Sequence, residues 1–148
     1  MKKCSRYLAV FVGLSAATTA YAQDDDAIDL VATSDLKWET TQEGVAFAAL
    51  DGDRFKESYQ AMVRLPAGLV SPVHIKSADM YGLIVSGEMV HLAQADIGGS
   101  ETVLKAGDYY KIPSGLPHVS KCVSDTECVT FLYQNGPFDF LPVGKDAQ

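Results

Sequence analysis

Residues 68–80 and 107–118 of the chain read GLVSPVHIKSADM and GDYYKIPSGLPH. Each stretch holds one histidine, His74 or His118, in a run that glycines and prolines interrupt. Glycine and proline at such positions mark tight turns between short strands. The two histidines are 44 residues apart, and they are the first candidates for a functional site.

The N-terminus has the features of a secretory signal peptide. Lys2, Lys3 and Arg6 precede an apolar run, and Ala20-Tyr21-Ala22 forms a cleavage site of the A-x-A type. The apolar run is too short to cross a bilayer, which takes roughly 20 apolar residues. We expect a leader over residues 1–22, a mature domain over residues 23–148, and a periplasmic or secreted location after cleavage near Ala22. An uncleaved anchor is the alternative.

The mature chain is strongly acidic. The whole chain has a net charge of -7, and loss of the three basic leader residues leaves 9 basic against 19 acidic residues, a net charge of -10. A surface of this charge repels phosphate groups, and no basic patch suited to nucleic acid is present. We therefore expect neither nucleic acid nor stable membrane insertion among the partners. The remaining 126 residues suit one domain.

Short β-rich runs recur along the mature chain, and no segment shows sustained helical periodicity. Turn sequences separate the runs at intervals of roughly 8–12 residues, which is typical of an antiparallel sandwich or barrel. A C-terminal extension, residues 137–148, offers Phe138 and Phe140 to cover a sheet edge or a partner. The expected strands are residues 28–32, 44–50, 58–65, 80–85, 88–93, 101–105, 109–112, 118–123 and 127–133.

Two cysteines remain once the leader is removed, Cys122 and Cys128. In an oxidising compartment, two cysteines that flank a polar turn between β-rich runs predict a disulfide across a hairpin. Because the loop is short, its stabilisation should fall toward the low end of ~2–4 kcal/mol, and the bond would hold the register of the hairpin. A metal site or a redox pair is the alternative, although the spacing matches neither a zinc knuckle nor C-x-x-C.

The spacing of the two opening stretches resembles the two motifs of the cupin superfamily, a small jelly-roll barrel also called the double-stranded β-helix. In the second motif Gly107, Pro113, Gly115 and His118 match the family pattern, and Cys122 stands where the family has asparagine. The chain is also similar to a subgroup of uncharacterised secreted cupins with a degenerate first metal motif. The resemblance implies an all-β, cupin-like jelly-roll barrel in a single domain, with motifs over residues 68–87 and 107–122.

The first motif departs from the family pattern at two ligand positions. Gly68, His74 and Gly87 match it, but Lys76 stands at the second histidine and Met80 at the glutamate. A cupin metal site resembles three imidazoles and one carboxylate around iron, manganese, copper, nickel or zinc. A protonated lysine has no lone pair, and a thioether suits copper(I) better than a hard divalent ion. The sequence is therefore compatible with one divalent transition metal in the barrel and with none.

Asp79 is the residue that could restore a carboxylate to the set. His74, Asp79 and His118 would then resemble the two-histidine, one-carboxylate centre of non-haem iron enzymes. Strand alternation places Asp79 on the opposite face from His74, so a bulge would have to turn it inward. With a spacing of four residues, Tyr81 would point inward instead. The alternative is that Asp79 caps a turn or pairs with a surface lysine.

The remaining candidates each have two interpretations. Lys76 shares a strand face with His74, so its ammonium could hold a carboxylate ligand, or its neutral amine could attack a carbonyl. Alternatively, it is a solvated residue at a strand end. His74 and His118 could equally be a hydrogen-bonded structural pair. His91, outside both motifs, is interpreted as a surface or core-edge residue in preference to a fourth ligand.

Two functions follow. The first is an exported binding protein that holds a small organic ligand, a divalent metal or both through His74 and His118, with Lys76, Met80 and Tyr81 beside them. The second is a metal-dependent enzyme of the dioxygenase, isomerase or lyase type acting on a small molecule. No serine nucleophile motif, phosphate loop or nucleotide fingerprint indicates a third class. The resemblance also implies a homodimer, to which Phe138 and Phe140 could contribute.

Overall fold

The computed structural model describes residues 27–144, so the expected leader and its cleavage site lie outside the described residues. No helix in this range is long and apolar enough to cross a membrane. Two single-turn 3-10 helices are present, η1 (Thr33–Asp35) and η2 (Gln94–Asp96). The strands are β1 (Trp38–Thr40), β2 (Ala46–Asp51), β3 (Tyr59–Leu65), β4 (His74–Ile75), β5 (Met80–Ser86), β6 (Met89–Ala93), β7 (Tyr109–Ile112), β8 (His118–Cys122), β9 (Cys128–Gln134) and β10 (Leu141–Pro142).

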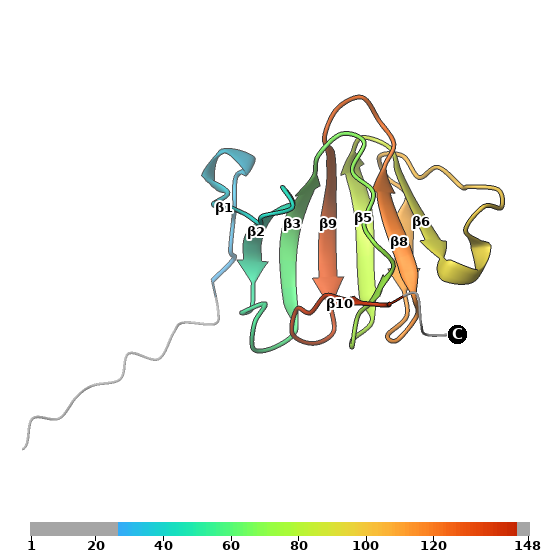
Figure 1. Cartoon of the computed structure of the whole chain (residues 1–148). Helices are drawn as coiled ribbons and strands as arrows, with labels where there is room; N and C mark the ends of the chain where they lie inside the picture. The colour runs from blue at the N-terminus through green and yellow to red at the C-terminus, as the bar shows by residue number, and fades with distance from the viewer. Residues whose placement is uncertain (1–26, 145–148) are drawn as a thin grey trace, which may run out of the picture. The chain divides into compact units, whose positions relative to one another are not determined.

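The strands form two antiparallel sheets. The larger sheet has the order β1-β2-β3-β9-β5-β7, and the smaller one has the order β10-β4-β8-β6. Figure 1 shows β9 lying between β3 and β5, although it follows both in the chain. Neighbours that are distant in sequence are typical of a jelly roll, in which the chain crosses repeatedly between sheets. The expected all-β, cupin-like architecture is thereby confirmed.

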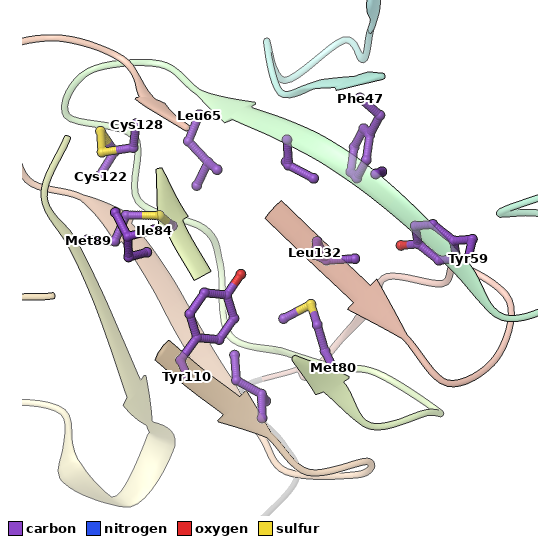
Figure 2. Packing of buried hydrophobic residues seen from close by; sticks show 13 residues of the cluster. Phe47, Tyr59, Leu65, Met80, Ile84, Met89, Tyr110, Cys122, Cys128 and Leu132 are labelled. Carbon is purple, nitrogen blue, oxygen red and sulfur yellow. A yellow bond between two sulfur atoms is a disulfide. The ribbon is translucent and has the colours of Figure 1, made fainter. Parts of the chain in front are cut away.

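The core lies between the two sheets. Along β3 the side chains Tyr59, Ala61, Val63 and Leu65 are all buried on the inner face, as strand alternation predicts. Residues of the smaller sheet, such as Met89, join the same cluster (Figure 2). The inner face of each strand can therefore be identified from its register.

The expected strands and the observed ones differ at five places along the chain. Residues 28–32 form no strand, and Ile28 and Leu30 are each 87% exposed. Residues 101–105 contribute only an isolated bridge between Leu104 and Met89. The strands β1, β4 and β10 were not expected, because two or three residues show too little alternation to be recognised.

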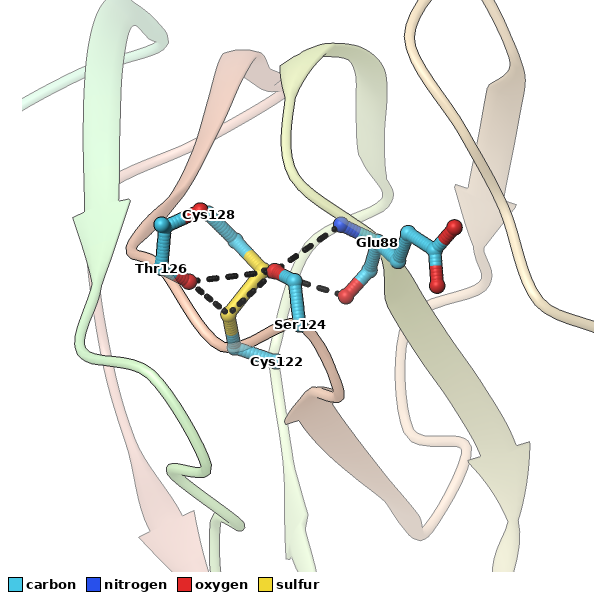
Figure 3. The surroundings of a disulfide bond; sticks show 5 residues. All are labelled: Glu88, Cys122, Ser124, Thr126 and Cys128. Carbon is cyan, nitrogen blue, oxygen red and sulfur yellow. Dashed lines mark hydrogen bonds between the residues drawn. A yellow bond between two sulfur atoms is a disulfide. The ribbon is translucent and has the colours of Figure 1, made fainter.

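The disulfide between Cys122 and Cys128 is present, but it does not close a hairpin. Cys122 ends β8 in the smaller sheet and Cys128 begins β9 in the larger sheet, with their Cα atoms 5.7 Å apart. The turn between them is held by Ser124, whose hydroxyl donates to the carbonyl of Thr126 and accepts from the amide of Glu88 (Figure 3). The expectation of a register-holding hairpin bond was wrong, because the chain changes sheets at this turn. The bond therefore joins the two layers.

A glycine in β5 allows an aromatic ring to cross the strand. A Cβ atom on Gly82 would lie 2.1 Å from the ring of Tyr110, so no other residue fits without displacing that ring. The Tyr110 hydroxyl reaches the Thr130 hydroxyl at 3.3 Å, and the ring is buried. Tyr110 thus extends across the inner face of the larger sheet toward the smaller one.

Candidate functional site

His74 and His118 are direct partners in the smaller sheet. Each begins its strand, β4 or β8, and the two residues face each other in the antiparallel register. Their ring centroids are 4.2 Å apart, and the residues are 4% and 1% exposed. The structure therefore brings the two motif histidines together in the barrel interior, as the motif spacing predicts.

The backbone orients both imidazole rings in the same way. His74 Nδ1 lies 3.0 Å from the carbonyl of Pro72, and His118 Nδ1 lies 2.8 Å from the carbonyl of Leu116. In each case Nδ1–H donates, so the tautomer we assign leaves the lone pair on Nε2. Among the described residues His118 Nε2 is buried without a hydrogen-bond partner. This nitrogen is available to accept a proton donor or to bind a metal.

Lys76 is buried beside the pair. It is 5% exposed, its Nζ donates to the carbonyl of Asp139, and Nζ lies 4.1 Å from the ring centroid of Phe138. Burial lowers the pKa of Lys76 to about 8, and the nearby carboxylate of Asp139 opposes the shift. The interpretation of Lys76 as a solvated strand-end residue was wrong, because the C-terminal residues cover it.

All three groups lie within electrostatic reach of one another. Burial is the main cause that lowers the pKa of His74 to about 4, and the charges of His118 and Lys76 lower it further. The pKa of His118 is also lowered, first by burial and then by Lys76, while the carbonyl of Leu116 opposes the shift. At neutral pH the interior therefore holds two uncharged imidazoles next to a predominantly protonated amine.

A third histidine lies on the same inner face. His91 in β6 is paired with Ser120 in β8, and its Nδ1 lies 2.9 Å from the Ser120 hydroxyl. Its ring centroid is 4.2 Å from that of Tyr110, and its Nε2 is buried without a partner among residues 27–144. Burial lowers the pKa of His91 to about 4, with further lowering from His118 and His74. His91 is thus a core-edge residue on the inner face of β6, within electrostatic reach of His74 and His118.

Of the two places expected for His91, surface or core edge, the structure shows the core edge. Its neighbours Val90 and Leu92 are both apolar, so strand alternation by itself does not show that His91 is buried. In the structure Val90 and Leu92 are buried in a separate cluster, while Met89 joins the main core on the His91 face. Both faces of β6 are covered, and the register opposite His118 is the signal that identifies His91.

Asp79 is not brought to the histidines. Its carboxylate accepts from the amide of Ser114 at 2.8 Å, pairs with Lys111 Nζ at 2.9 Å and accepts from the Tyr81 hydroxyl at 3.2 Å. These contacts, the Ser114 amide first, lower the pKa of Asp79 to about 2. No inward bulge forms at this point, because Met80 begins β5 in regular register with Ile112. The alternative of a turn cap paired with a surface lysine describes Asp79 correctly.

The two residues after Asp79 are also placed away from the pair. Met80 is 6% exposed and packs in the main core. Tyr81 lies on the outer face of β5, where its ring stacks on that of Tyr133 with centroids 5.9 Å apart. Neither side chain is therefore arranged to serve as a ligand with His74 and His118.

The C-terminal strap, defined as residues 136–143, covers this site. Phe140 stacks on His74 with ring centroids 4.1 Å apart and planes inclined by 18°. The Asp139 carboxylate accepts from the amide of Ser77 at 3.0 Å and 3.2 Å, and β10 pairs with β4. The expectation that the C-terminal extension covers a sheet edge is thereby confirmed. The strap also closes the space above Lys76.

The side chains do not complete the metal site that the cupin resemblance implies. In the part of the chain that the structure describes, no group of three histidine, cysteine, aspartate or glutamate side chains is placed to hold a metal ion. His74 and His118 offer two imidazole nitrogens, but Lys76 places a positive charge where a third ligand would stand. The donor set fits an anionic ligand better than a cation.

Comparisons with known proteins agree with the fold and the motifs. The family described as the ChrR cupin-like domain matches residues 26–139. Dimethylsulfoniopropionate lyase DddQ of Ruegeria pomeroyi is 30% identical over 140 residues, covering 85% of this chain and 67% of the lyase. The solved structure of that lyase has a TM-score of 0.56 at 25% identity and covers 76% of this chain and 62% of its own.

Two further solved structures are similar in fold. The polyketide cyclase RemF of Streptomyces resistomycificus has a TM-score of 0.64 at 16% identity, covering 82% of this chain and 89% of its own. An RmlC-like cupin of Shewanella frigidimarina has a TM-score of 0.57 at 19% identity, covering 81% of this chain and 96% of its own. At these identities the likeness concerns the fold alone.

Proposed function

The chain belongs to the ChrR cupin-like domain family, and from this membership we propose that it binds a small organic anion inside the barrel. Lys76 is the charged anchor, and His74 and His118 are the hydrogen-bonding groups beside it. The observation that carries the proposal is the burial of a lysine next to two neutral imidazoles. The hydrogen-bond acceptor of Lys76 is the neutral carbonyl of Asp139, and a buried ammonium group gains from an anion in direct contact with it. A carboxylate ligand is the class that this arrangement suits best.

The route to the site passes the C-terminal strap. Phe140 covers His74, and Asp139 provides the carbonyl that now accepts from Lys76. A carboxylate at Lys76 would replace that carbonyl, because both are oxygen acceptors for the same ammonium group. Binding therefore couples to a movement of the strap away from β4.

Binding of small carboxylates tests the anchor. Propionate and succinate are titrated into the exported protein and followed by calorimetry. We expect the Lys76→Gln variant to bind at least tenfold more weakly, while Lys105→Gln, which changes a lysine paired on the surface with Glu88, binds as the native protein does. Equal affinity of the native and Lys76→Gln proteins would refute the anchor.

Metal analysis tests whether the same site holds a metal ion. We expect protein purified from the periplasm to hold no stoichiometric iron, manganese, copper, nickel or zinc, and the Lys76→His variant to gain one ion. Stoichiometric metal in the native protein that disappears in His118→Ala would instead support a metal-bound form of the site. Two free thiols in the exported protein would refute the disulfide between Cys122 and Cys128.

A catalytic role is the second candidate, and the pKa of Lys76 favours it. With the pKa of Lys76 at about 8, a fraction of its amine is neutral near pH 7 and can act as a base or a nucleophile. The imidazole of His74, with its pKa at about 4, is a much weaker base. The similarity to dimethylsulfoniopropionate lyase suggests that compound as a first substrate. Its consumption, followed by proton NMR, should stop in Lys76→Gln if this candidate holds.

A homodimer is also part of the proposal. Phe138 packs on Phe47 and Phe140 packs on His74, so much of their surface is used within the chain, although Phe140 remains 38% exposed. The outer face of the larger sheet offers an apolar row instead, whose members are paired across all six strands. The row consists of Trp38, Ala48, Met62, Phe131, Leu83 and Tyr109. Leu83 and Tyr109 are its exposed members, while Ala48 is fully buried and Arg64 covers the ring of Trp38.

The size and charge of this outer face suit a second copy of the chain. Six strands spaced about 4.8 Å apart and about 20 Å long present roughly 600 Å², which approaches the ~800 Å² per partner of a standard interface. Ion pairs flank the row, Arg64 with Glu127 and Lys111 with Asp79, so the face itself carries no excess charge. Two acidic chains can therefore meet here without strong repulsion.

A further inference from the structure

A cavity of about 510 Å³ opens at the edge of the larger sheet that β1, β2 and β3 form. Its apolar wall is formed by inner-face residues of two adjacent strands, Phe47 and Ala49 on β2 and Tyr59 and Ala61 on β3. Figure 2 shows Phe47 and Tyr59 at this edge of the core. The residues that line the cavity include neither Lys76 nor any of the three histidines, so the cavity is separate from the site described above.

Arg54 is the cation of this cavity. Its guanidinium carbon lies 4.7 Å from the ring centroid of Phe47 and 4.6 Å from that of Phe55. The two rings restrict the orientation of the guanidinium plane, and the side chain is only 19% exposed. A guanidinium with a restricted plane and limited hydration is well prepared for a planar anion.

The anion that Arg54 now contacts is weakly held. Arg54 Nη2 donates to Glu39 Oε2 at 3.1 Å, and this is its one side-chain hydrogen bond among the described residues. The Glu39 side chain is 74% exposed, so it keeps most of its hydration. Such a solvent-exposed ion pair adds little to stability, so the guanidinium can exchange Glu39 for another carboxylate at little cost.

The other charges around the cavity leave it close to neutral. Asp53 is paired with Lys56 at 2.6 Å and accepts from the amide of Phe55 at 3.0 Å. Asp35 and Lys37 line the same rim with opposite charges. An incoming anion therefore meets no net repulsion. A ligand cation would not fit between the rings of Phe47 and Phe55, because the guanidinium of Arg54 already occupies that position.

We propose that this cavity is a second small-molecule site, which binds an apolar monocarboxylate. The ligand carboxylate takes the guanidinium of Arg54 in place of Glu39, and the hydrocarbon body lies along Phe47, Ala49 and Ala61. The volume falls within the range of about 300–1,000 Å³ that is usual for small-molecule pockets. This site goes beyond the proposed barrel function and does not depend on it.

Octanoate is the probe, with octanamide as an uncharged ligand of the same shape. Calorimetry on the native protein should show one octanoate per chain and at least tenfold weaker binding of octanamide. Arg54→Gln should weaken octanoate binding at least tenfold. Glu39→Gln removes the competing carboxylate and should strengthen binding about threefold, and its exposed position leaves folding intact.

Opposite effects at Arg54 and Glu39 support the site, and three outcomes overturn it. These are no octanoate binding, equal binding to the native and Glu39→Gln proteins, and equal binding of octanoate and octanamide. If Arg54→Gln does not fold, the Glu39→Gln result decides. Lys76→Gln distinguishes the two sites, because octanoate affinity that falls in this variant and is unchanged in Glu39→Gln belongs to the barrel and refutes the second site.

Discussion

The ring of Phe140 lies stacked on the ring of His74, with centroids 4.1 Å apart, although 66 residues separate the two in the chain. This contact places a segment outside both sequence motifs directly over a motif histidine. Together with the contact between Lys76 and Phe138, it makes the C-terminal strap part of the site. The properties of the two buried groups therefore depend on residues that no motif includes.

Removal of the Phe140 ring should raise the pKa of His74. Burial is the main cause of its lowered pKa of about 4, so Phe140→Ala, which exposes the ring, should move the pKa toward 6.5. The stability should fall by about 1–2 kcal/mol, because Phe140 is 38% exposed and only part of its surface is lost from packing. Proton NMR titration of His74 measures the shift. Phe55→Ala is the control, and an unchanged pKa in Phe140→Ala would contradict the role of the strap.

Stability should decrease as the pH falls from about 6.5 to about 4. His74 and His91 both have a pKa of about 4 in the folded protein, against 6.5 when unfolded. In this window the unfolded chain binds protons that the folded chain excludes, so acid favours unfolding. For His74 the loss is at most on the order of 3 kcal/mol, since one pKa unit corresponds to about 1.4 kcal/mol. Urea unfolding at several pH values checks this, and His91→Gln should show a smaller slope.

Reduction of the disulfide should destabilise the protein by roughly 2 kcal/mol. The bond between Cys122 and Cys128 closes a loop with a sequence separation of 6, for which the chain-entropy contribution is small. Denaturant unfolding with and without reductant measures the difference. A variant with serine at both positions should have the same free energy of unfolding as the reduced protein, with or without reductant. A reduced protein as stable as the oxidised one would show that the link between the sheets contributes nothing.

Gly82→Ala should be more damaging than alanine at a turn glycine. The new Cβ would overlap the Tyr110 ring, which packs against His91, so we expect a loss of roughly 2–4 kcal/mol. Gly115→Ala is the matched control, because its Cβ meets nothing within 4 Å and only the positive φ of 72° is strained. That change should cost about 1 kcal/mol. Equal losses in the two variants would mean that Tyr110 moves aside freely.

Leu83→Glu should convert a dimer to a monomer. Leu83 is 42% exposed in the apolar row on the outer face, between Phe131 and Tyr109 near the β7 edge of the sheet. Light scattering coupled to size-exclusion chromatography gives the mass directly. Val123→Glu changes a valine of similar exposure, 41%, next to the disulfide and away from the row, and should leave the dimer intact. A native protein that runs as a monomer would remove this part of the proposal.

The turns and the fold could be predicted because they depend on local chemistry. The motif glycines Gly68, Gly87, Gly107 and Gly115 all have positive φ, a conformation that other residues rarely adopt. A Cβ on Gly87 would also lie 2.9 Å from the Cys128 sulfur, so the tight turn needs glycine twice over. Such requirements are written in the residue types and their spacing. The resemblance of this spacing to the cupin motifs implied the jelly roll in which the two histidines meet.

Side-chain direction was predictable only where one face of a strand is exposed. On β3 the alternation identified the inner residues correctly. On β6 both faces are covered, so alternation could not decide between a surface and a core-edge position for His91. Asp79 kept the outward parity of a regular strand, and the bulge that would have turned it inward did not form.

The all-β class, most of the long strands and the cysteine pairing could be inferred from the residues of this chain alone. Tertiary contacts alone place Lys76 under Phe138 and Phe140, join two sheets through Cys122 and Cys128, and create the cavity around Arg54. Turn geometry depends on neighbouring residues, whereas burial and the pKa values it shifts depend on segments that reach the site from elsewhere in the chain. Whether Lys76 serves as a buried cation or a surface charge was therefore decided by a strap about 60 residues away.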